Sequence, residues 1–224
     1  MAKVITTDTI ESKSLLTDFD IYLFKSGKHY KLYEKLGSRI VKFGNEEGAF
    51  FAVWAPNAQS VSVIGNFNHW QKGKHKLHSR WDQSGIWEGF FPDVKHGEAY
   101  KYAIHSNTGE YLEKSDPFAT YFETPPKTAS ILWEPKYEWN DQAWMDERKL
   151  LAGKPKPYSV YEVHFGSWKR KYEENNRSLT YPEMAIELVN YVKDLGFTHV
   201  EFLPLMEHPF YGSWGYQLTG YFAP

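Results

Sequence analysis

The pattern of apolar and turn-forming residues changes once along this chain, near residue 158, and this change limits what the chain can fold into. Between 48 and 133, short strand-like runs alternate with turn residues at short intervals. After Pro157 the sequence contains a strand-like run, a helical run and a second strand-like run. Short strands with frequent turns are typical of a β-sandwich, whereas a strand, a helix and a strand in succession are typical of a βαβ unit. The sequence therefore predicts two regions of different fold class.

We expect the first region to be an immunoglobulin-like β-sandwich. Its strand-like runs are AFFAVWAP, SVSVIGNF, IWEGFFPDV, AYKYAIHS and ASILW, and Gly, Pro, Asn and Ser interrupt them. Before this region, Thr17 and Asp20 form a helix-capping pattern. A second short helix is expected over 29–36, ended by Gly37.

In the second region, strands are expected over 158–165 and 198–205, with a helix over 180–195 between them. Thr180 and Glu183 form a T-x-x-E capping box, and apolar residues recur at helical spacing up to Gly196. One such unit cannot bury both faces of its sheet, and a (β/α)₈ barrel needs roughly 250 residues. We therefore expect only a truncated first βαβ unit of such a barrel.

These patterns predict a mainly β protein with four segments along the chain. Residues 1–40 are expected to form a tail and short helices, and residues 41–135 the β-sandwich. A charged linker over 136–157 closes with Lys-Pro-Lys-Pro, and residues 158–224 follow as the βαβ unit.

The aromatic content is high, at 18%, with 9 Trp, 16 Tyr and 15 Phe. This is more ring surface than close packing requires, so part of it is expected to bind a ligand with flat faces, either a nucleobase or a sugar ring. The formal net charge is −2, whereas a protein that binds nucleic acid carries a clear basic excess. We therefore expect a neutral glucan as ligand and no nucleic-acid partner.

The chain contains no cysteine, which excludes disulfides and thiolate metal sites within these residues. The first residues lack the apolar core of a secretion signal, and no stretch has the roughly 18 apolar residues of a membrane span. His69, His75 and His78 share a Lys-rich loop without a carboxylate or thiolate at ligand spacing. We expect a cytoplasmic protein with no membrane partner, no metal and no cofactor.

Three segments carry the most specific motifs. The first combines FAVWAPNAQSVSVIGNFNHW with GIWEGFFPDVKHGEAYKY and KSDPFA, the second is YEVHFGSW, and the third is FTHVEFLPLMEHPFYGSWGYQLTGYFAP. Together they resemble the glycogen branching enzymes of the α-amylase superfamily. The first segment is also similar to the carbohydrate-binding module shared by isoamylases and the glycogen-binding part of AMP-activated kinase β subunits.

In the sandwich, the resemblance assigns sugar contacts to three residues. Trp70 follows a turn that can present its indole flat to a sugar ring, and it matches the stacking tryptophan of these modules. Lys101 matches a lysine that reaches sugar hydroxyls. Tyr111 stands where the modules carry a second tryptophan, in a segment two residues longer. The alternative is packing for the rings and a solvated strand position for Lys101.

Five other tryptophans in the chain have no ligand role in this interpretation. Trp87 is expected in the core, and packing is the default for the others, which are Trp81, Trp133, Trp139 and Trp144.

In the βαβ region the candidates follow the second strand, because the loops after barrel strands carry function. They are Trp214, Tyr216 and Gln217. The resemblance implies that Tyr216 stacks under the sugar whose bond is broken. Gln217 stands where hydrolytic amylases carry Asp and isoamylase-type debranching enzymes Asn. The alternative is packing at the barrel rim, and the mid-strand Glu162 and Glu201 are interpreted as structural.

The resemblance implies a retaining reaction, in which an Asp attacks an α-1,4 link, a Glu protonates the leaving oxygen, and a sugar 6-hydroxyl takes the glycosyl group to form an α-1,6 branch. In this family the carboxylates come from the fourth, fifth and seventh barrel strands. We therefore expect no catalytic residue here, but binding of α-glucan (glycogen and malto-oligosaccharides) and association with the remainder of the barrel. Two alternatives stay open: a fragment of an isoamylase-type debranching enzyme or trehalohydrolase, and a stand-alone glycogen-binding regulatory module.

Overall fold

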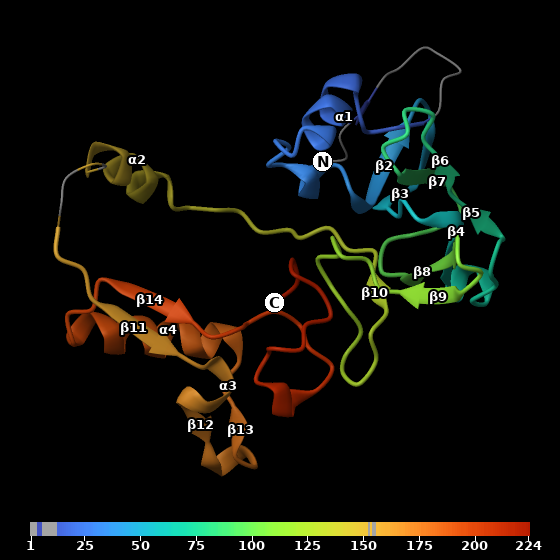
Figure 1. Ribbon diagram of the computed structural model, residues 1–224. Coiled ribbons are helices and arrows are strands. Elements are labelled where there is room, and N and C mark those ends of the chain that lie inside the picture. The colour runs from blue at the N-terminus through green and yellow to red at the C-terminus, as the bar shows by residue number, and fades with distance from the viewer. Residues whose placement is uncertain (1–3, 6–12, 152, 154–155) are drawn as a thin grey trace. The chain divides into compact units, whose positions relative to one another are not determined.

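The computed structural model describes residues 4–5, 13–151, 153 and 156–224 (Figure 1). They form two compact units. The first unit runs to Pro135 and includes Met206–Pro209 and Leu218–Pro224, and the second comprises Lys136–Leu205 and Phe210–Gln217. Among the described residues, no helix has both the length and the apolar character needed to cross a membrane.

Two β-sheets make up most of the first unit. One has the order β1-β2-β3-β7-β6, with β1 (Val4–Ile5), β2 (Gly37–Phe43), β3 (Glu46–Trp54), β7 (Ile86–Phe91) and β6 (His78–Ser79). The other has the order β10-β8-β4-β5, with β9 also paired to β8, and contains β10 (Ser130–Ile131), β8 (Ala99–Ser106), β4 (Ala58–Gly65), β5 (His75–Lys76) and β9 (Tyr111–Lys114). The mainly β class predicted from the turn-separated runs is confirmed.

The main core lies between these sheets, which makes the first unit a β-sandwich. It joins buried side chains of β3 to those of β4 and β8, and its strand residues are Ala49, Phe51, Val53, Val61, Val63, Tyr100 and Tyr102. Side chains alternate between the two faces of a strand. Residues 60, 62 and 64 of β4 and residues 101, 103 and 105 of β8 therefore belong to the opposite, outer face of the second sheet.

Asp116 holds two tyrosine side chains of β8 toward the core. Its buried carboxylate accepts hydrogen bonds from the hydroxyl of Tyr100 at 2.6 Å and from that of Tyr102 at 3.0 Å. Burial raises the pKa of the Asp116 carboxyl, and the hydrogen bonds from the tyrosines and from the Phe118 amide only partly oppose this rise. Because both tyrosines are held inward, Lys101 between them is held on the outer face.

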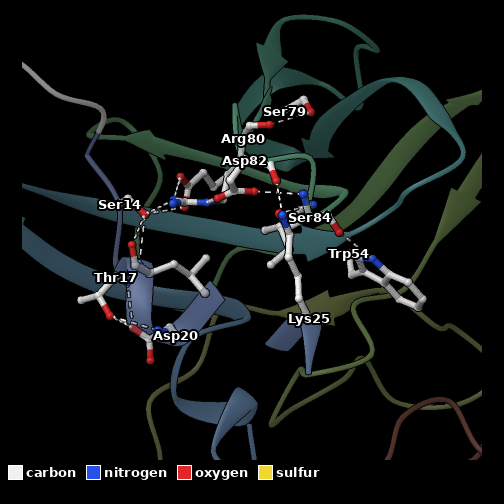
Figure 2. A network of polar contacts seen from close by, with 12 residues as sticks. Ser14, Thr17, Asp20, Lys25, Trp54, Ser79, Arg80, Asp82 and Ser84 are labelled. Atoms are coloured by element: carbon white, nitrogen blue, oxygen red, sulfur yellow. Dashed lines mark hydrogen bonds and ion pairs between the residues drawn. The ribbon is translucent and has the colours of Figure 1, made fainter. Parts of the chain in front are cut away.

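Helix α1 (Asp18–Lys25) packs on the other side of the first sheet, where Ile21 belongs to a second core cluster with Phe50 and Ala52 of β3. The predicted capping box between Thr17 and Asp20 is confirmed. The segment before the helix is held by Arg80, whose Nη1 donates to Ser14 Oγ at 2.7 Å (Figure 2).

The helix predicted over 29–36 is wrong. Only a 3₁₀ turn, η1 (Leu32–Glu34), forms there, and Gly37 begins β2 instead of ending a helix. Tyr30 is 87% exposed and Tyr33 is 49% exposed, so the apolar residues of this segment do not share one buried face. Without such a face a short helix has little to stabilise it, and Gly37, at φ +92°, turns the chain into the strand.

The second unit contains the predicted order of strand, helix and strand. Strands β11 (Val160–Val163) and β14 (His199–Phe202) pair in parallel, and α4 (Tyr181–Asp194) lies between them in sequence. Thr180 and Glu183 form the predicted capping box. The core of this unit joins α4 to β11 through Val163, Leu179, Met184, Leu188 and Val192.

The other elements of the second unit are short. They are α2 (Gln142–Leu151), α3 (Phe165–Trp168), β12 (Arg170–Lys171), η3 (Tyr172–Glu174), β13 (Arg177–Ser178) and η4 (Tyr211–Ser213). Helix α2 occupies the predicted linker and is longer than the one or two turns that its charged sequence suggests.

Candidate functional site

The outer face of the second sheet carries two of the predicted sugar-binding residues. In the strand register, Ser60 of β4 lies opposite His105 of β8, and His105 lies opposite Tyr111 of β9. Ile64 of β4 lies opposite Lys101. Lys101 and Tyr111 therefore share one face of the sheet, because Tyr111 lies opposite His105, four residues from Lys101 along β8.

Trp70 lies at the Lys101 end of this sheet, after a turn built on Asn68. The side chain of Asn68 is fully buried, accepts a hydrogen bond from Gly65 N at 3.0 Å and donates to Val63 O at 2.9 Å. Gly65 is required here because a Cβ atom would collide with the carbonyl of Ala99 on the neighbouring strand. The turn, η2 (Asn66–Asn68), then closes with a hydrogen bond of 2.8 Å from Trp70 N to Gly65 O.

The Trp70 indole is held in place but not buried. Its Nε1 donates to Asn66 Oδ1 at 2.9 Å, and 37% of the residue is exposed. Its φ of 58° lies in the left-handed region, which residues other than glycine seldom adopt. Such backbone conformations cluster at functional sites, where the surrounding structure enforces them. These features favour a ligand contact over packing for Trp70.

Lys101 is half-buried, and its Nζ donates to Thr128 Oγ1 at 2.9 Å. The lysine is therefore neither freely solvated nor buried in the core. An ammonium group has three donors, so two of them stay available for other acceptors.

Tyr111 stacks on a residue that the sequence interpretation missed. Its ring lies nearly parallel to the His105 imidazole, with centroids 4.3 Å apart and an interplanar angle of 10°. Both residues line a hollow of about 200 Å³ on the outer face, together with Ser60, Ser62, Lys72 and Lys76. Sequence alone could have found His105 only through the register, because it is the residue opposite Tyr111 on β8.

The packing predicted for Trp87 is confirmed, whereas that for Trp81, Trp139 and Trp144 is wrong. Trp133 packs between His96 and Tyr121 but keeps part of its surface exposed. Trp87 packs against the main core and donates from Nε1 to Ala55 O at 3.0 Å. The other four are exposed, at 79% for Trp81, 40% for Trp133, 77% for Trp139 and 58% for Trp144. Trp81 lies on the turn between β6 and β7, and neither Trp139 nor Trp144 belongs to a core cluster of the described residues.

In the second unit, Trp214 follows η4 and faces His164, the residue after β11. The two rings lie 5.5 Å apart at 39°, and Trp214 is 60% exposed, with a left-handed φ of 55°. The Tyr211 hydroxyl anchors this loop by donating to Gly166 O at 3.2 Å. The loop is thereby held against α3, which begins directly after His164 at the carboxyl end of β11.

Tyr216 and Gln217 lie beside Trp214 on the same loop, and both are exposed. The Tyr216 amide donates to Ser213 O at 3.0 Å, while 66% of the residue is accessible. The loop therefore presents an aromatic ring and an amide together, a combination suited to the faces and hydroxyls of a sugar. Glu162 and Glu201 lie opposite each other in the middle of β11 and β14.

Comparison with known proteins defines the class of the first unit. Residues 35–119 match the family described as Carbohydrate-binding module 48 (Isoamylase N-terminal domain). Similar solved structures include a putative α-amylase from Salmonella typhimurium, with a TM-score of 0.56 and 21% identity over 84% of this chain and 28% of that chain. The catalytic module of SpuA, a glycogen-degrading pneumococcal virulence factor, gives a TM-score of 0.58 and 22% identity over 84% of this chain and 32% of that chain. The chain thus carries a carbohydrate-binding module, and its fold is similar to that of these two proteins.

Sequence relatives specify the family further. The 1,4-alpha-glucan branching enzyme GlgB of Aquifex aeolicus is 54% identical over 211 residues, which are 94% of this chain and 33% of that protein. GlgB of Albidiferax ferrireducens is 51% identical over 93% of this chain and 32% of that protein. The chain is therefore a homologue of the 1,4-alpha-glucan branching enzymes over nearly its whole length, and it spans about one third of theirs.

Proposed function

We propose that this chain is the glucan-binding part of a cytoplasmic 1,4-α-glucan branching enzyme, which transfers α-1,4-glucan chains to 6-hydroxyls during glycogen synthesis. The proposal assigns α-glucan binding to the outer face of the second sheet, between Trp70 and the stacked pair of Tyr111 and His105. Lys101 supplies a hydrogen-bond donor between these two ends.

The observation that carries the proposal is that the Trp70 side chain is both held in place and accessible. Its indole is fixed by Asn66 and its backbone is left-handed, yet the ring is accessible. A fixed and exposed aromatic ring loses little conformational entropy on binding, so it makes an efficient platform for the C–H face of a glucose residue.

The second unit supports the link to an enzyme. We assign β11, α4 and β14 to the start of a (β/α)₈ barrel, with Trp214, Tyr216 and Gln217 on a loop at the active-site end of the strands. In this assignment Tyr216 stacks under the sugar at the scissile bond. The two carboxylates of a retaining mechanism, about 5 to 5.5 Å apart, would come from strands outside these 224 residues.

Two alternative functions, a stand-alone glycogen-binding module and part of a debranching enzyme, are less well supported. A stand-alone glycogen-binding module has no use for a βαβ unit with an exposed aromatic loop. A debranching enzyme would have the same architecture, but the relatives that are about 50% identical over most of this chain are named branching enzymes.

Isothermal titration calorimetry of the 224-residue chain with maltoheptaose tests the binding claim. Cellohexaose is the matched ligand control, because it has the same glucose units joined by β-1,4 links. We expect heat with maltoheptaose and none with cellohexaose. Equal binding of both, or no binding of maltoheptaose at millimolar concentration, would contradict the proposal.

A further inference from the structure

A groove of about 430 Å³ opens in the first unit, away from the outer face of the second sheet. It is bounded by β2, by the segment around Phe118 and Thr120, and by Trp133 to Pro135. Its volume lies within the roughly 300 to 1,000 Å³ of small-molecule sites. No residue of the Trp70, Lys101 and Tyr111 surface lines it.

Trp133 lines the groove, and its ring packs between two other rings. Trp133 lies between His96, with centroids 4.6 Å apart at 42°, and Tyr121, at 5.1 Å and 32°. Trp133 is 40% exposed and Tyr121 is 50% exposed. Trp133 therefore presents a partly exposed ring that is supported by its neighbours, and such a ring suits the C–H face of a sugar.

Two further aromatic residues, Tyr33 and Phe118, line the groove. Tyr33, 49% exposed, lines the groove and lies 6.4 Å from the Phe222 ring, which in turn stacks on Phe118 at 5.2 Å and 17°. The main chain of Trp133 is held by Thr120, whose Oγ1 donates to the Trp133 carbonyl at 3.1 Å. The groove therefore has three aromatic lining residues, each of which contacts another ring outside the lining.

The charges that line the groove favour a neutral ligand. Glu34 and Glu134 balance Lys35 and Arg39, so the lining has no charge excess. Lys35 Nζ is bound to Asp20 Oδ2 at 3.0 Å, and Arg39 Nη2 donates to the carbonyls of Tyr33 and Leu36. An anionic ligand would find no unbalanced cation here, whereas the hydroxyls of a sugar can use carboxylate, hydroxyl and backbone partners alike.

We propose that this groove, with Trp133 as its central platform, is a second α-glucan site on the carbohydrate-binding unit. The inference rests on the proposed function, because it takes the ligand to be the same polymer. Two sites on separate surfaces of one unit would let a branched glucan engage both, which raises the apparent affinity for glycogen above that for a short linear oligosaccharide.

Nuclear magnetic resonance of the tryptophan indole N–H groups tests the inference. The signals of Trp133 and Trp70 are assigned by their loss in Trp133→Phe and Trp70→Phe, and maltoheptaose is then added to the wild-type chain. We expect both signals to shift with concentration. Trp81→Phe identifies the matched control, an exposed tryptophan on the turn between β6 and β7, whose signal should not move.

The two proposals fail in different ways in this experiment. If the Trp70 signal shifts and the Trp133 signal does not, the groove is not a glucan site and the proposed function stands. If the Trp133 signal shifts in the Trp70→Ala chain as it does in the wild type, the groove binds maltoheptaose independently of Trp70. In the Trp133→Ala chain, calorimetry should then show that the dissociation constant of the groove for maltoheptaose rises at least tenfold. The indole N–H signal of Trp70 should still shift in that variant. If neither signal shifts, both proposals are overturned.

Discussion

The indole Nε1 of Trp70 donates a hydrogen bond of 2.9 Å to Oδ1 of Asn66, four residues earlier in the chain. This bond fixes the ring across its own turn while the ring stays partly accessible. We expect Trp70→Ala to weaken binding of maltoheptaose by about thirtyfold at the sandwich surface, because an aromatic anchor contributes about 2 kcal/mol or more. Calorimetry, with circular dichroism to confirm folding, measures the change.

Trp81→Ala is the control for that experiment, since it removes an equally large exposed ring outside the proposed surface. Its affinity should equal that of the wild type. If Trp70→Ala is folded and binds as well as Trp81→Ala, Trp70 is a packing residue.

A smaller loss is expected for Lys101→Ala. A hydrogen bond to a neutral hydroxyl contributes roughly 0.5 to 1.5 kcal/mol, and the Lys101 ammonium already has Thr128 as a partner. The dissociation constant should therefore rise by about two- to tenfold, measured by the same titration. A loss larger than that of Trp70→Ala would reverse the proposed order of the two residues.

We expect Tyr111→Ala to have an effect between those of Lys101→Ala and the wild type. Tyr111 keeps an exposed ring, but one of its faces is covered by His105. Calorimetry on His105→Ala should give a similar change if the stacked pair acts as one platform. Unequal effects would show that only one of the two rings contacts sugar.

The fold was most predictable where local rules and burial agree. The capping boxes at Thr17 and Thr180 need only the side chains and amides of one turn, so sequence spacing identified both. The segment before Gly37 was not predictable in the same way, because its conformation depends on whether Tyr30 and Tyr33 find a surface to cover. That is decided by tertiary packing.

The candidate site also contains residues that the sequence predicts and residues that only the tertiary structure reveals. Sequence reasoning selected Trp70 and Trp214, and both have left-handed backbones that no local pattern indicates. It missed His105 and His164, because each meets its aromatic partner only through strand pairing or loop closure. It also assigned Trp133 to packing, since a tryptophan after a short strand gives no signal of the groove beside it.

Catalysis gives a further prediction. The 224-residue chain should form no new α-1,6 links in amylose, because the carboxylate pair of a retaining mechanism is proposed to lie in strands outside these residues. The measurement is debranching of the product followed by analysis of chain lengths, against a mock preparation. New branches above that background would place catalytic groups within these residues.

The polar network around Arg80 should contribute strongly to stability. The Arg80 guanidinium donates to Glu88 Oε1 at 2.6 Å and to Asp82 Oδ2 at 2.7 Å, and all three side chains are buried. Burial raises the pKa of Glu88 although Ser14 and Arg80 donate to it. Arg80→Ala would leave buried carboxylates without their cation, a change that costs about 3 to 5 kcal/mol of unfolding free energy.

Urea denaturation measures this loss, and Lys13→Ala is the matched control. Lys13 pairs with Glu46 at the surface, where both side chains are about half exposed, so its removal should cost less than about 1 kcal/mol. Equal losses for the two variants would mean that the buried network adds no stability beyond a surface pair.

Asp20 should make the stability of the first unit depend on pH in the acid range. Burial opposes its ionisation, but hydrogen bonds from Thr17, Lys35 and His29 outweigh this effect and hold the pKa of Asp20 well below its usual range. A carboxyl with a lowered pKa in the folded state stabilises the fold above its unfolded pKa of about 4, and this contribution is lost as pH falls further. Asp20→Asn keeps the shape of the side chain and removes its charge.

In urea denaturation the wild type should therefore have a higher free energy of unfolding than Asp20→Asn at pH 7 and 5, and the difference should shrink steadily from pH 4 to pH 2. A difference that stays constant over this range would show that the charge of Asp20 does not stabilise the fold.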